Sequence, residues 1–446
     1  MASTRLDRTN GSPTNGQKGT FSTWVRVDKV AAQKIMINYL NSENYSYIRF
    51  HPSKFLQCYA TLSNSVVNNY KTERSFVDFN GWYHIVARID TTQATATDRL
   101  RLYVNGELQT AYDTQTYSGS QNAQHPILIA SATNTHRIGA DENPADYFSG
   151  LMSHFHFCDG YSYDASAFGS TDATTGEWKI NTSPSVTYGN NGFFILKDGN
   201  SLTDQSGNSN NFTVGGGTLT KTEDNPSNVF ATLNPLATST TSGSFSNGNT
   251  THAKSNSTWA STTSTLAASS GKYYAEYKFT ANSSSSNGQM AAIVNMDLTN
   301  YMNENSDLEQ NGNKGITYYA NGTVFADNQQ TVATYSSYGD AIIQIAMDLD
   351  NGFLYFGKDG TWQNSGVPTS GSTGTGGINI SNYIGAGTYA FGLANRNTGA
   401  TSVNFGNGYF GTTAVSSAGT NASGNGIFEY DVPTGYTALS TKGLNL

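Results

Sequence analysis

Apolar and polar residues alternate along many short segments of the chain, and glycine, asparagine or serine separates one segment from the next. In residues 98–104 (DRLRLYV), an extended backbone would place Leu100, Leu102 and Val104 on one side and Arg101 on the other. Comparable runs occupy residues 19–27, 82–90, 193–197, 272–279, 341–348, 353–356 and 389–394. No long segment repeats its apolar residues at a helical period. The pattern predicts an all-β protein of short antiparallel strands, arranged as β-sandwiches with one buried and one wet face per sheet.

Two Asn-Gly pairs mark tight turns between such segments. Asn105-Gly106 follows RLYV, and Asn351-Gly352 separates IAMDLD from FLYFGK. Both residue types tolerate the positive φ angles of a type I′ turn, whose twist matches that of two antiparallel strands. The sequence therefore predicts a β-hairpin with a type I′ turn at each pair.

The chain changes character between about 215 and 260, where two Asn-Pro pairs and a triple glycine occur and few residues could form a core. With 446 residues the chain is too long for one core. We therefore expect a first domain at 1–221, a linker or strap at 222–240 and a second domain at 241–446. The apolar motif VFATLNPL predicts that the connecting segment packs as a strap.

Charge and composition exclude several classes of partner. Only 13% of the residues are charged, the net charge is −8, and lysine and arginine form no run. Nucleic-acid binding needs such positive charges to neutralise phosphates. No apolar run approaches the roughly 20 residues of a membrane-crossing helix, and the start lacks the apolar segment of a signal peptide. We expect no nucleic-acid partner, no membrane insertion and synthesis in a cytoplasm.

Residues 150–161 (GLMSHFHFCDGY) pose the question of a metal site. In an extended chain His154, His156 and Cys158 share one face, and an H-x-H pair with a cysteine is one way to hold zinc. No spacing ties a further ligand to this segment, so we favour a plain strand whose two phenylalanines enter the core. Cys58 and Cys158 are expected to be buried free thiols, with a disulfide between them as the alternative.

Several segments resemble known families. The pieces FSTWVR, WYHIV, RLYVNGEL, RIG and FSGLM, within residues 19–27, 82–106 and 138–158, are similar in order and spacing to the laminin-G or concanavalin-A-like lectin/glucanase family. Residues 154–236 resemble a lectin-like module of tailed-phage structural proteins, through FHFCDGYSYDASAFGSTDATTGEWK, YGNNGFFILKDGNSLTDQSGNSNNFTV and NPSNVFATLNPL. The resemblance implies a jelly-roll sandwich for the first domain.

The second half resembles a SPRY (B30.2-like) domain, another antiparallel sandwich. The similar segments are SSGKYYAEYKF, GDAIIQIAMDLDNGFLYFGKDG, YAFGLANRNTGATSVNFGNGYF and VPTGYTAL, within residues 271–446. One departure concerns residues 204–214, which resemble a piece that laminin-G-like domains often carry at their beginning. Either the strand order is permuted, or this segment folds back beside the first strands.

No catalytic residue is predicted. The lectin/glucanase resemblance would imply an E-x-D-x-x-E strand in a glycan-cutting member, and the sequence lacks it, as it lacks a G-x-S-x-G elbow and a phosphate loop. Glu429 and Asp431 come nearest, and we expect them on the solvent face of a last strand. No cofactor is expected. Calcium stays open, because lectin-like sandwiches often hold it on loop oxygens, and Asp141 and Asn143 are the candidates, with Asp198, Asp204 and Asn208 as further ones.

Tyrosines in predicted loops are the candidate ligand contacts, because their rings stack on sugar CH faces. Tyr47, Tyr335 and Tyr338 are the three selected. The resemblances then imply a non-enzymatic virion surface protein of tail-fibre type that binds a host cell-surface glycan or protein and contacts other virion proteins. Two alternatives stay open: a capsid or tail decoration protein with a structural role, and a glycan-degrading tail enzyme. Tail or capsid location and assembly into a homo-oligomer stay open as well.

Overall fold

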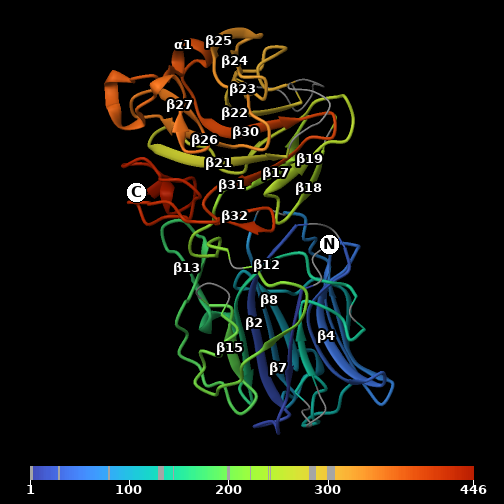
Figure 1. Cartoon of the computed structure of the whole chain (residues 1–446). Helices are drawn as coiled ribbons and strands as arrows, with labels where there is room; N and C mark the ends of the chain where they lie inside the picture. Colours follow the sequence, from blue (N-terminus) through green and yellow to red (C-terminus); the bar gives the residue numbers. More distant parts are fainter. Residues whose placement is uncertain are drawn as a thin grey trace. The chain divides into compact units, whose positions relative to one another are not determined.

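The computed structural model describes the chain except for residues 1–3, 29–30, 79–80, 129–134, 144, 198–200, 221, 240, 242, 281–287, 299–306 and 446. Two compact units divide it, Met1–Lys221 (unit 1) and Thr222–Leu446 (unit 2). Both are built from antiparallel β-sheets, and the only α-helix among the described residues is the single turn α1 (Ser381–Ile384). The all-β prediction is therefore confirmed (Figure 1).

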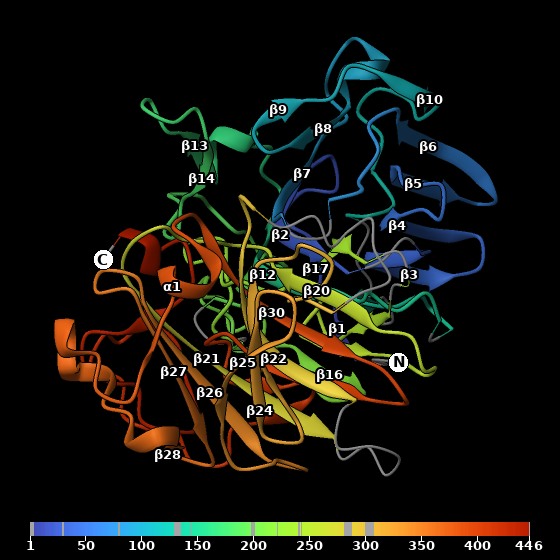
Figure 2. The ribbon, with the colours of Figure 1, turned by 90° about the horizontal axis from the view of Figure 1, so that it is seen from above.

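Unit 1 consists of two large sheets around one core. The eight-stranded sheet contains, in spatial order, β10 (Tyr112–Tyr117), β6 (Ser65–Thr72), β5 (Leu56–Leu62), β4 (Asn44–Phe50), β3 (Gln33–Asn41), β11 (Thr135–Ile138), β1 (Arg5–Thr9) and β16 (Thr213–Gly216). The six-stranded sheet contains β15 (Phe193–Ile195), β12 (Gly150–Asp159), β2 (Lys18–Val27), β7 (Tyr83–Asp90), β8 (Leu100–Val104) and β9 (Glu107–Leu108). Smaller elements are η1 (Ala96–Asp98), η2 (Ala165–Ala167), β13 (Gly169–Thr171) and β14 (Trp178–Ile180). Figure 2 shows β3, β4, β5 and β6 following one another side by side.

The pairing of β16 with β1 resolves the strand-order question for residues 204–214. Leu6 is registered opposite Val214 in an antiparallel pair, and Arg5 opposite Gly216. The late segment thus folds back beside the first strand of the unit. The last strand of unit 1, β16, therefore lies beside its first strand, β1, at the edge of the eight-stranded sheet.

The six-stranded sheet differs from the prediction of one wet face. Leu100, Leu102 and Val104 face the shared core, as the alternation predicts. Yet Tyr103 is buried on the opposite face, in a second cluster with Phe168. The segment 161–188, which connects β12 to β15, covers this face with apolar side chains. Some positions of β8 and β12 that were expected at the surface are therefore buried.

The two Asn-Gly hairpins differ in their turns. Asn105 and Gly106 both have positive φ, and Val104 pairs with Glu107, so the type I′ prediction is confirmed. Asp348 instead pairs with Phe353 around a four-residue loop, in which Gly352 has positive φ and Asn351 does not. The type I′ prediction is wrong there. The Asp348 carboxylate accepts the Asn351 backbone N–H at 3.0 Å, which stabilises the longer turn.

Unit 2 has its own pair of sheets. The seven-stranded sheet contains β17 (Leu233–Thr238), β20 (Ala260–Ser264), β30 (Tyr389–Asn395), β22 (Gln289–Asn295), β23 (Gly315–Tyr319), β24 (Thr323–Ala326) and β25 (Gln330–Thr334). The nine-stranded sheet contains β18 (Ser244–Ser246), β19 (Thr251–Ala253), β31 (Ala400–Asn404), β21 (Lys272–Thr280), β26 (Ile342–Asp348), β27 (Phe353–Lys358) and β28 (Thr361–Trp362), with β29 (Ile378–Asn379) on β27 and β34 (Thr437–Ala438) on β21. Smaller elements are η4 (Gln363–Ser365), η5 (Pro368–Thr373), η6 (Gly443–Asn445), β32 (Tyr409–Phe410) and β33 (Thr413–Ala414).

The segment 222–240 lies within unit 2. Phe230 and Leu233 are buried, β17 pairs with β20, and Phe230 forms a bridge to Ser440. Leu236, expected to pack, is 66% exposed. The apolar motif is thus an edge strand of the second sandwich.

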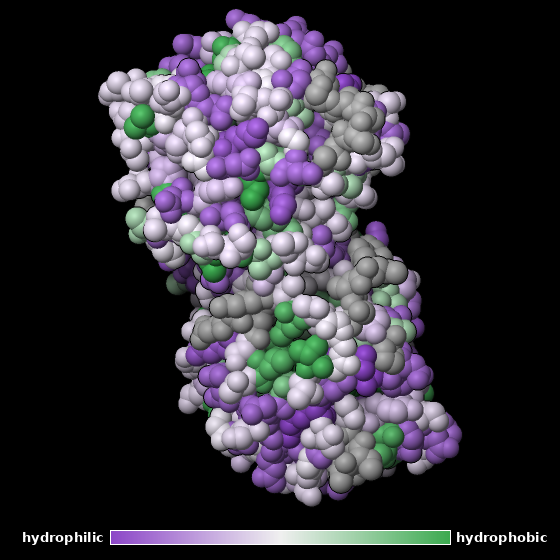
Figure 3. All heavy atoms as spheres, viewed as in Figure 1, coloured by the Kyte–Doolittle hydropathy of each residue, from purple (hydrophilic) through white to green (hydrophobic). Residues whose placement is uncertain are grey.

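The surface matches the composition. In the view of Figure 3, hydrophilic and weakly polar side chains dominate, with one compact hydrophobic patch on unit 1. Cys58 and Cys158 are buried free thiols, as expected. Within the described part of the chain, no helix combines the length and apolar character that a membrane crossing needs.

Candidate functional site

The outer face of the eight-stranded sheet, opposite the core of unit 1, carries aromatic and polar side chains on adjacent strands. On β4, Ile48 and Phe50 enter the core, so Tyr47 and Arg49 point the other way. Register then places Tyr59 of β5 beside Tyr47. Strand alternation and antiparallel pairing are therefore enough to assemble this face from residues that are distant in sequence.

Three tyrosines form the tyrosine cluster of this face: Tyr45, Tyr47 and Tyr59. The ring centroids of Tyr47 and Tyr59 lie 5.2 Å apart at an interplanar angle of 19°, and Tyr45 lies 6.2 Å from Tyr47 and 5.9 Å from Tyr59. Lys34 Nζ lies 3.7 Å from the Tyr47 centroid and 3.0 Å from an Asp141 carboxylate oxygen. Tyr47 is only 8% exposed, whereas Tyr45 and Tyr59 are half-buried. Tyr47 thus supports two neighbours whose surfaces reach solvent.

A polar row runs beside the tyrosine cluster and consists of Arg49, Gln57, Asn69 and Lys71. Arg49 Nε donates to Gln57 Oε1 at 2.8 Å, and Gln57 Nε2 donates to Asn69 Oδ1 at 2.8 Å. Lys71 is registered opposite Gln57 on β6. Within the described ranges, neither Arg49 nor Lys71 forms an ion pair. The row therefore presents two cations that no described carboxylate neutralises.

Electrostatics confirm the positive character of this row. Burial, and then the charges of Arg49 and Lys71, lower the pKa of His51 at the end of β4. Burial also raises the pKa of Tyr47 and of Tyr45, so both phenols stay protonated at neutral pH. The face therefore carries neutral rings that have the cations of the polar row on one side and the carboxylates of Asp141 and Glu142 on the other, whose charges also raise the pKa of Tyr45.

The same sheet carries a polar groove at its other end, over β11, β1 and β16. Its volume is about 570 Å³, and its lining residues are Asp7, Arg8, Thr9, Thr135, Arg137, Ser209, Asn210, Asn211 and Thr213. Arg137 Nε donates to the Asp7 carboxylate at 2.6 Å, and Arg5 Nε does so at 3.1 Å. Arg5 and Arg137 thus share one carboxylate, while Arg8 forms no ion pair within the described ranges and donates to the Asn191 carbonyl oxygen and to Asn210 Oδ1 instead.

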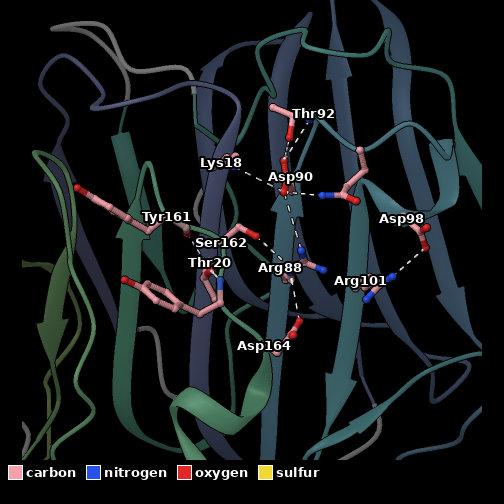
Figure 4. A network of polar contacts seen from close by, with 12 residues as sticks. Lys18, Thr20, Arg88, Asp90, Thr92, Asp98, Arg101, Tyr161, Ser162 and Asp164 are labelled. Atoms are coloured by element: carbon pink, nitrogen blue, oxygen red, sulfur yellow. Dashed lines mark hydrogen bonds and ion pairs between the residues drawn. The ribbon is translucent and has the colours of Figure 1, made fainter.

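A charged network lies on the six-stranded sheet and offers a contrast (Figure 4). Arg88 lies 3.9 Å from Asp90 and 3.6 Å from Asp164, and Lys18 lies 3.9 Å from Asp90. Burial alone would raise the pKa of Asp90, but hydrogen bonds from neighbouring side chains and the charge of Lys18 lower it below its usual value. Each cation of this network therefore has an anionic partner, unlike those of the polar row.

A serine and a histidine of the six-stranded sheet meet but are not arranged for nucleophilic catalysis. His84 Nε2 lies 2.8 Å from Ser22 Oγ, and Trp178 Nε1 donates to His84 Nδ1 at 3.0 Å. An indole can only donate, so Nδ1 is the acceptor and Nε2 carries the proton. His84 therefore donates to Ser22, the reverse of what a general base does. Burial lowers the pKa of His84 to about 3.

The H-x-H-x-C segment is a strand, as expected, but its polar side does not face solvent. Phe155 and Phe157 enter the core, and a bulge with positive φ at His154 interrupts the alternation. His156 Nδ1 lies 2.9 Å from the Tyr188 hydroxyl, and Cys158 is buried. Among the described residues, no group of three histidine, cysteine or acidic side chains could hold a metal ion.

The calcium candidates do not converge on a common point. The Asp141 carboxylate is bound by Lys34, and Arg137 Nη1 donates to the carbonyl oxygen of Asp141 at 2.8 Å. Asn143 is exposed in the same turn. The Asp204 carboxylate accepts the backbone N–H groups of Ser206 and Asn210 in its own loop and that of Phe194 on β15, the last at 2.8 Å. The Asn208 side chain donates to the carbonyl oxygens of Gly189 and Gly192. Asp198 lies outside the described residues.

Of the other two candidate tyrosines, neither reproduces the arrangement around Tyr47. Tyr338 is buried in the core of unit 2 and donates to the Tyr318 carbonyl at 2.7 Å. Tyr335 is half-buried against the same core. The expected contact loop at 335–338 is therefore an inward-facing segment, because both rings complete the hydrophobic packing.

An acid pair in unit 2 escaped the sequence analysis. Tyr319 Oη lies 2.7 Å from Asp307 Oδ2 and 2.6 Å from Glu309 Oε1, and all three side chains are buried. One phenol carries one proton, so it can donate to one carboxylate only. The other short contact requires a protonated carboxyl that donates to the phenol oxygen. Burial, and then the charge of Asp307, raise the pKa of Glu309 to about 8.

The acid pair is unlike the carboxylates of a glycosidase. Such enzymes hold them about 5–10 Å apart on either side of a sugar, whereas here both contact one hydroxyl. Glu429 and Asp431, expected on a last strand, lie in irregular backbone instead. The Asp431 carboxylate accepts the Thr420 N–H at 2.6 Å, so it stabilises a loop.

Comparison with known proteins supports the lectin-like character of unit 1. Residues 3–166 match the family model of the concanavalin A-like lectin/glucanases superfamily, Laminin_G_3. No curated protein sequence matches the chain.

Solved structures resemble parts of the chain. The SPRY domain of human HERC1 is 12% identical with a TM-score of 0.30, over 38% of this chain and 96% of that one. A heptameric SAP-like pentraxin from Limulus polyphemus is 14% identical with a TM-score of 0.27, over 35% and 70%. The TRIM65 PSpry domain is 11% identical with a TM-score of 0.29, over 39% and 88%. Residues 3–166 of this all-β chain are thus similar to the laminin-G, concanavalin A-like lectins, a lectin-like fold that suggests carbohydrate or protein binding. SPRY domains are among the structural neighbours of the chain.

Proposed function

We propose that the chain is a glycan-binding protein and that the tyrosine cluster on the outer face of the eight-stranded sheet is its contact surface. The observation that carries the proposal is a stack of rings with two accessible members, Tyr45 and Tyr59, beside the hydrogen-bonding groups of the polar row. Aromatic rings offer a flat apolar surface to sugar CH groups, and amides and guanidinium groups bind sugar hydroxyls. A preformed stack loses little side-chain freedom on binding.

A sugar suits this face better than a protein partner does. The tyrosine cluster offers apolar ring faces and the polar row offers hydrogen-bonding groups, side by side over a few strands. A chain of sugar rings likewise offers apolar CH faces beside polar hydroxyl groups. Stable protein interfaces need a desolvated apolar centre, and here Lys34 lies over the central ring. The proposed partner is therefore a surface polysaccharide.

Substitution of Tyr59 tests the proposal. Tyr59→Ala removes an accessible ring without opening the core. We expect binding to the retained members of an array of defined oligosaccharides to weaken about fivefold or more, since loss of a stacking ring removes on the order of 1 kcal/mol or more. Tyr161→Ala is the matched control, because Tyr161 is a 37% exposed tyrosine on the other side of unit 1. Equal loss in both variants, or none in Tyr59→Ala, would reject this surface.

We expect the chain to bind its glycan without hydrolysing it. Two features support this: the proton placement at His84 and Ser22, and the single hydroxyl that the acid pair shares. Release of reducing ends from a bound polysaccharide over several hours would contradict the proposal and favour the glycan-degrading alternative.

The proposed location is the surface of a tailed-phage virion, with a host cell-surface glycan as ligand and other virion proteins as neighbours. The support is the similarity of residues 154–236 to phage structural modules. We expect peptides of the chain in density-purified particles, and labelled protein on intact host cells. If the protein is found in particles but does not bind cells, the decoration role is favoured. If it is absent from particles, the proposed location on the virion is rejected.

A further inference from the structure

We infer that the ligand of the outer face is an acidic glycan, one whose sugars carry a carboxylate, sulfate or phosphate group. This inference rests on the proposed function and names the ligand class. Arg49 and Lys71 are its basis, since they are the cations of the polar row and neither is ion-paired within the described ranges. Two uncompensated cations beside stacked rings match a ligand that has both an apolar ring face and a negative charge.

The spacing of the face fits such a ligand. Arg49 and Lys71 both lie opposite Gln57 in the register, so their backbones stand two strands apart, about 10 Å. The row of Tyr47 and Tyr59 lies two residues away from that row along each strand, about 7 Å. A sugar stacked on Tyr59 thus has either cation within side-chain reach of its acidic group.

The orientation of Arg49 supports this use. Its Nε donates to Gln57, which fixes the guanidinium plane, and its Cζ lies 5.0 Å from the Tyr47 centroid. These contacts hold the side chain in place and leave the two terminal nitrogens for an anion, in the forked geometry that suits a carboxylate or sulfate. Lys71 Nζ lies 5.6 Å from the centroid of the Phe55 ring, so a cation–π contact positions its ammonium group.

The rest of the molecule makes the site selective. The chain carries a net charge of −8 and repels polyanions in general. The cations of the charged network lie beside Asp90 and Asp164. In the groove, Arg5 and Arg137 share Asp7, and Arg8 forms no ion pair within the described ranges, but no aromatic residue lines this groove. The polar row is therefore the place on the described part of unit 1 where an acidic sugar meets positive charge and an aromatic stack together.

The experiment compares acidic oligosaccharides with their neutral parents on the full chain. The probes are an array of uronic-acid, sialylated and sulfated oligosaccharides beside the desulfated, desialylated or methyl-esterified forms. We expect retention of acidic members, at least tenfold weaker binding of the neutral forms, and weakening with added salt. Arg49→Gln/Lys71→Gln should lose the acidic preference at least tenfold, because the new amide at position 49 can still donate to Gln57 while both charges are gone.

A charge-matched control separates a site from general attraction. Arg101→Gln/Lys179→Gln removes the same two charges from ion pairs elsewhere on unit 1 and should leave binding unchanged. Circular dichroism and thermal unfolding would verify that each variant is folded. Equal binding of acidic and neutral forms, or equal loss in the two double variants, overturns this inference and leaves the proposed glycan binding standing. If the wild-type chain retains no member of the array, both proposals fall.

Discussion

Most of the buried histidines lie in unit 1, whereas the buried carboxyls with raised pKa values lie in unit 2. In unit 1, burial lowers the pKa of four imidazoles, those of His84, His125, His136 and His156. In unit 2, burial raises the pKa of three carboxyls, those of Glu276, Asp307 and Glu309, and lowers that of His252. In both units burial favours the neutral form of these groups, which are bases in unit 1 and mainly acids in unit 2.

The difference teaches that the two sandwiches should respond to pH in opposite directions. A histidine whose folded pKa is lowered favours folding above its unfolded pKa, and that stability is lost as the pH falls below about 6.5. A carboxyl whose folded pKa is raised favours folding at low pH, and that stability is lost as the pH rises from about 4.5 through the folded pKa.

The largest expected effect is acid unfolding of unit 1. The pKa of His84 and of His125 is about 3 in the folded chain. Each would therefore remove about 3 kcal/mol of stability at pH 4, and together this equals the whole stability of many domains. Pulsed proteolysis of the full chain at pH 7 and pH 4, with fragments assigned by mass spectrometry, should show cleavage in residues 4–220 first. Simultaneous cleavage of both units would refute the contrast.

The second effect concerns the hydroxyl that the acid pair shares. Tyr319→Phe leaves Asp307 and Glu309 without their common hydrogen-bond partner. We expect it to lower the free energy of unfolding of unit 2 by about 3 kcal/mol. Tyr277→Phe is the control, because the Tyr277 hydroxyl is buried without a hydrogen-bond partner among the described residues. Urea unfolding at pH 7 measures both. A similar cost for the two variants would show that the acid pair does not depend on Tyr319.

The third effect is alkaline destabilisation of unit 2. The pKa of Glu309 is about 8 in the folded chain. Because pH 7 lies below this value and pH 9 above it, we expect unit 2 to lose roughly 1–2 kcal/mol of stability between pH 7 and pH 9. Glu309→Gln keeps the shape and removes the titration, and it should flatten this part of a urea-unfolding profile measured against pH. A slope that persists in Glu309→Gln would mean that another group titrates there.

The smallest effect isolates one imidazole of unit 1. Ser22→Ala removes the acceptor of the His84 Nε2–H, and we expect a cost of about 1 kcal/mol at pH 7. Ser46→Ala on the other sheet is matched, since its buried hydroxyl has no hydrogen-bond partner among the described residues, and it should cost nothing. Chemical unfolding of both variants measures the difference, and a reversed order would contradict the hydrogen-bond assignment at His84.

Local rules were enough to predict the strands but not what covers them. Alternation predicted the inward side of β8 and the inward direction of Phe155 and Phe157, because side-chain direction follows from the backbone alone. It failed at Tyr103 and His156, which are buried by the segment 161–188, a contact between distant segments. It also missed the bulge at His154.

The candidate site was predictable only in part. Tyr47 was selected from the sequence, but as a loop residue, and that placement was wrong, because it lies on β4. Tyr45 follows from alternation along the same strand. Tyr59 joins them only through the register of β4 with β5, which no sequence pattern states. For the acid pair, Asp307 and Glu309 stand two residues apart in the sequence, but they lie at a turn, where strand alternation does not apply. Their meeting point on Tyr319 depends on how the chain folds back.

The pairing of β16 with β1 has a consequence for modular reuse. Because Arg5 and Gly216 are partners across adjacent strands, the entrance and the exit of the first sandwich are neighbours. A module with adjoining ends can be spliced into a loop of another protein, or have its ends joined and new ones opened, without a long tether. The first sandwich can therefore be inserted into another protein as one unit.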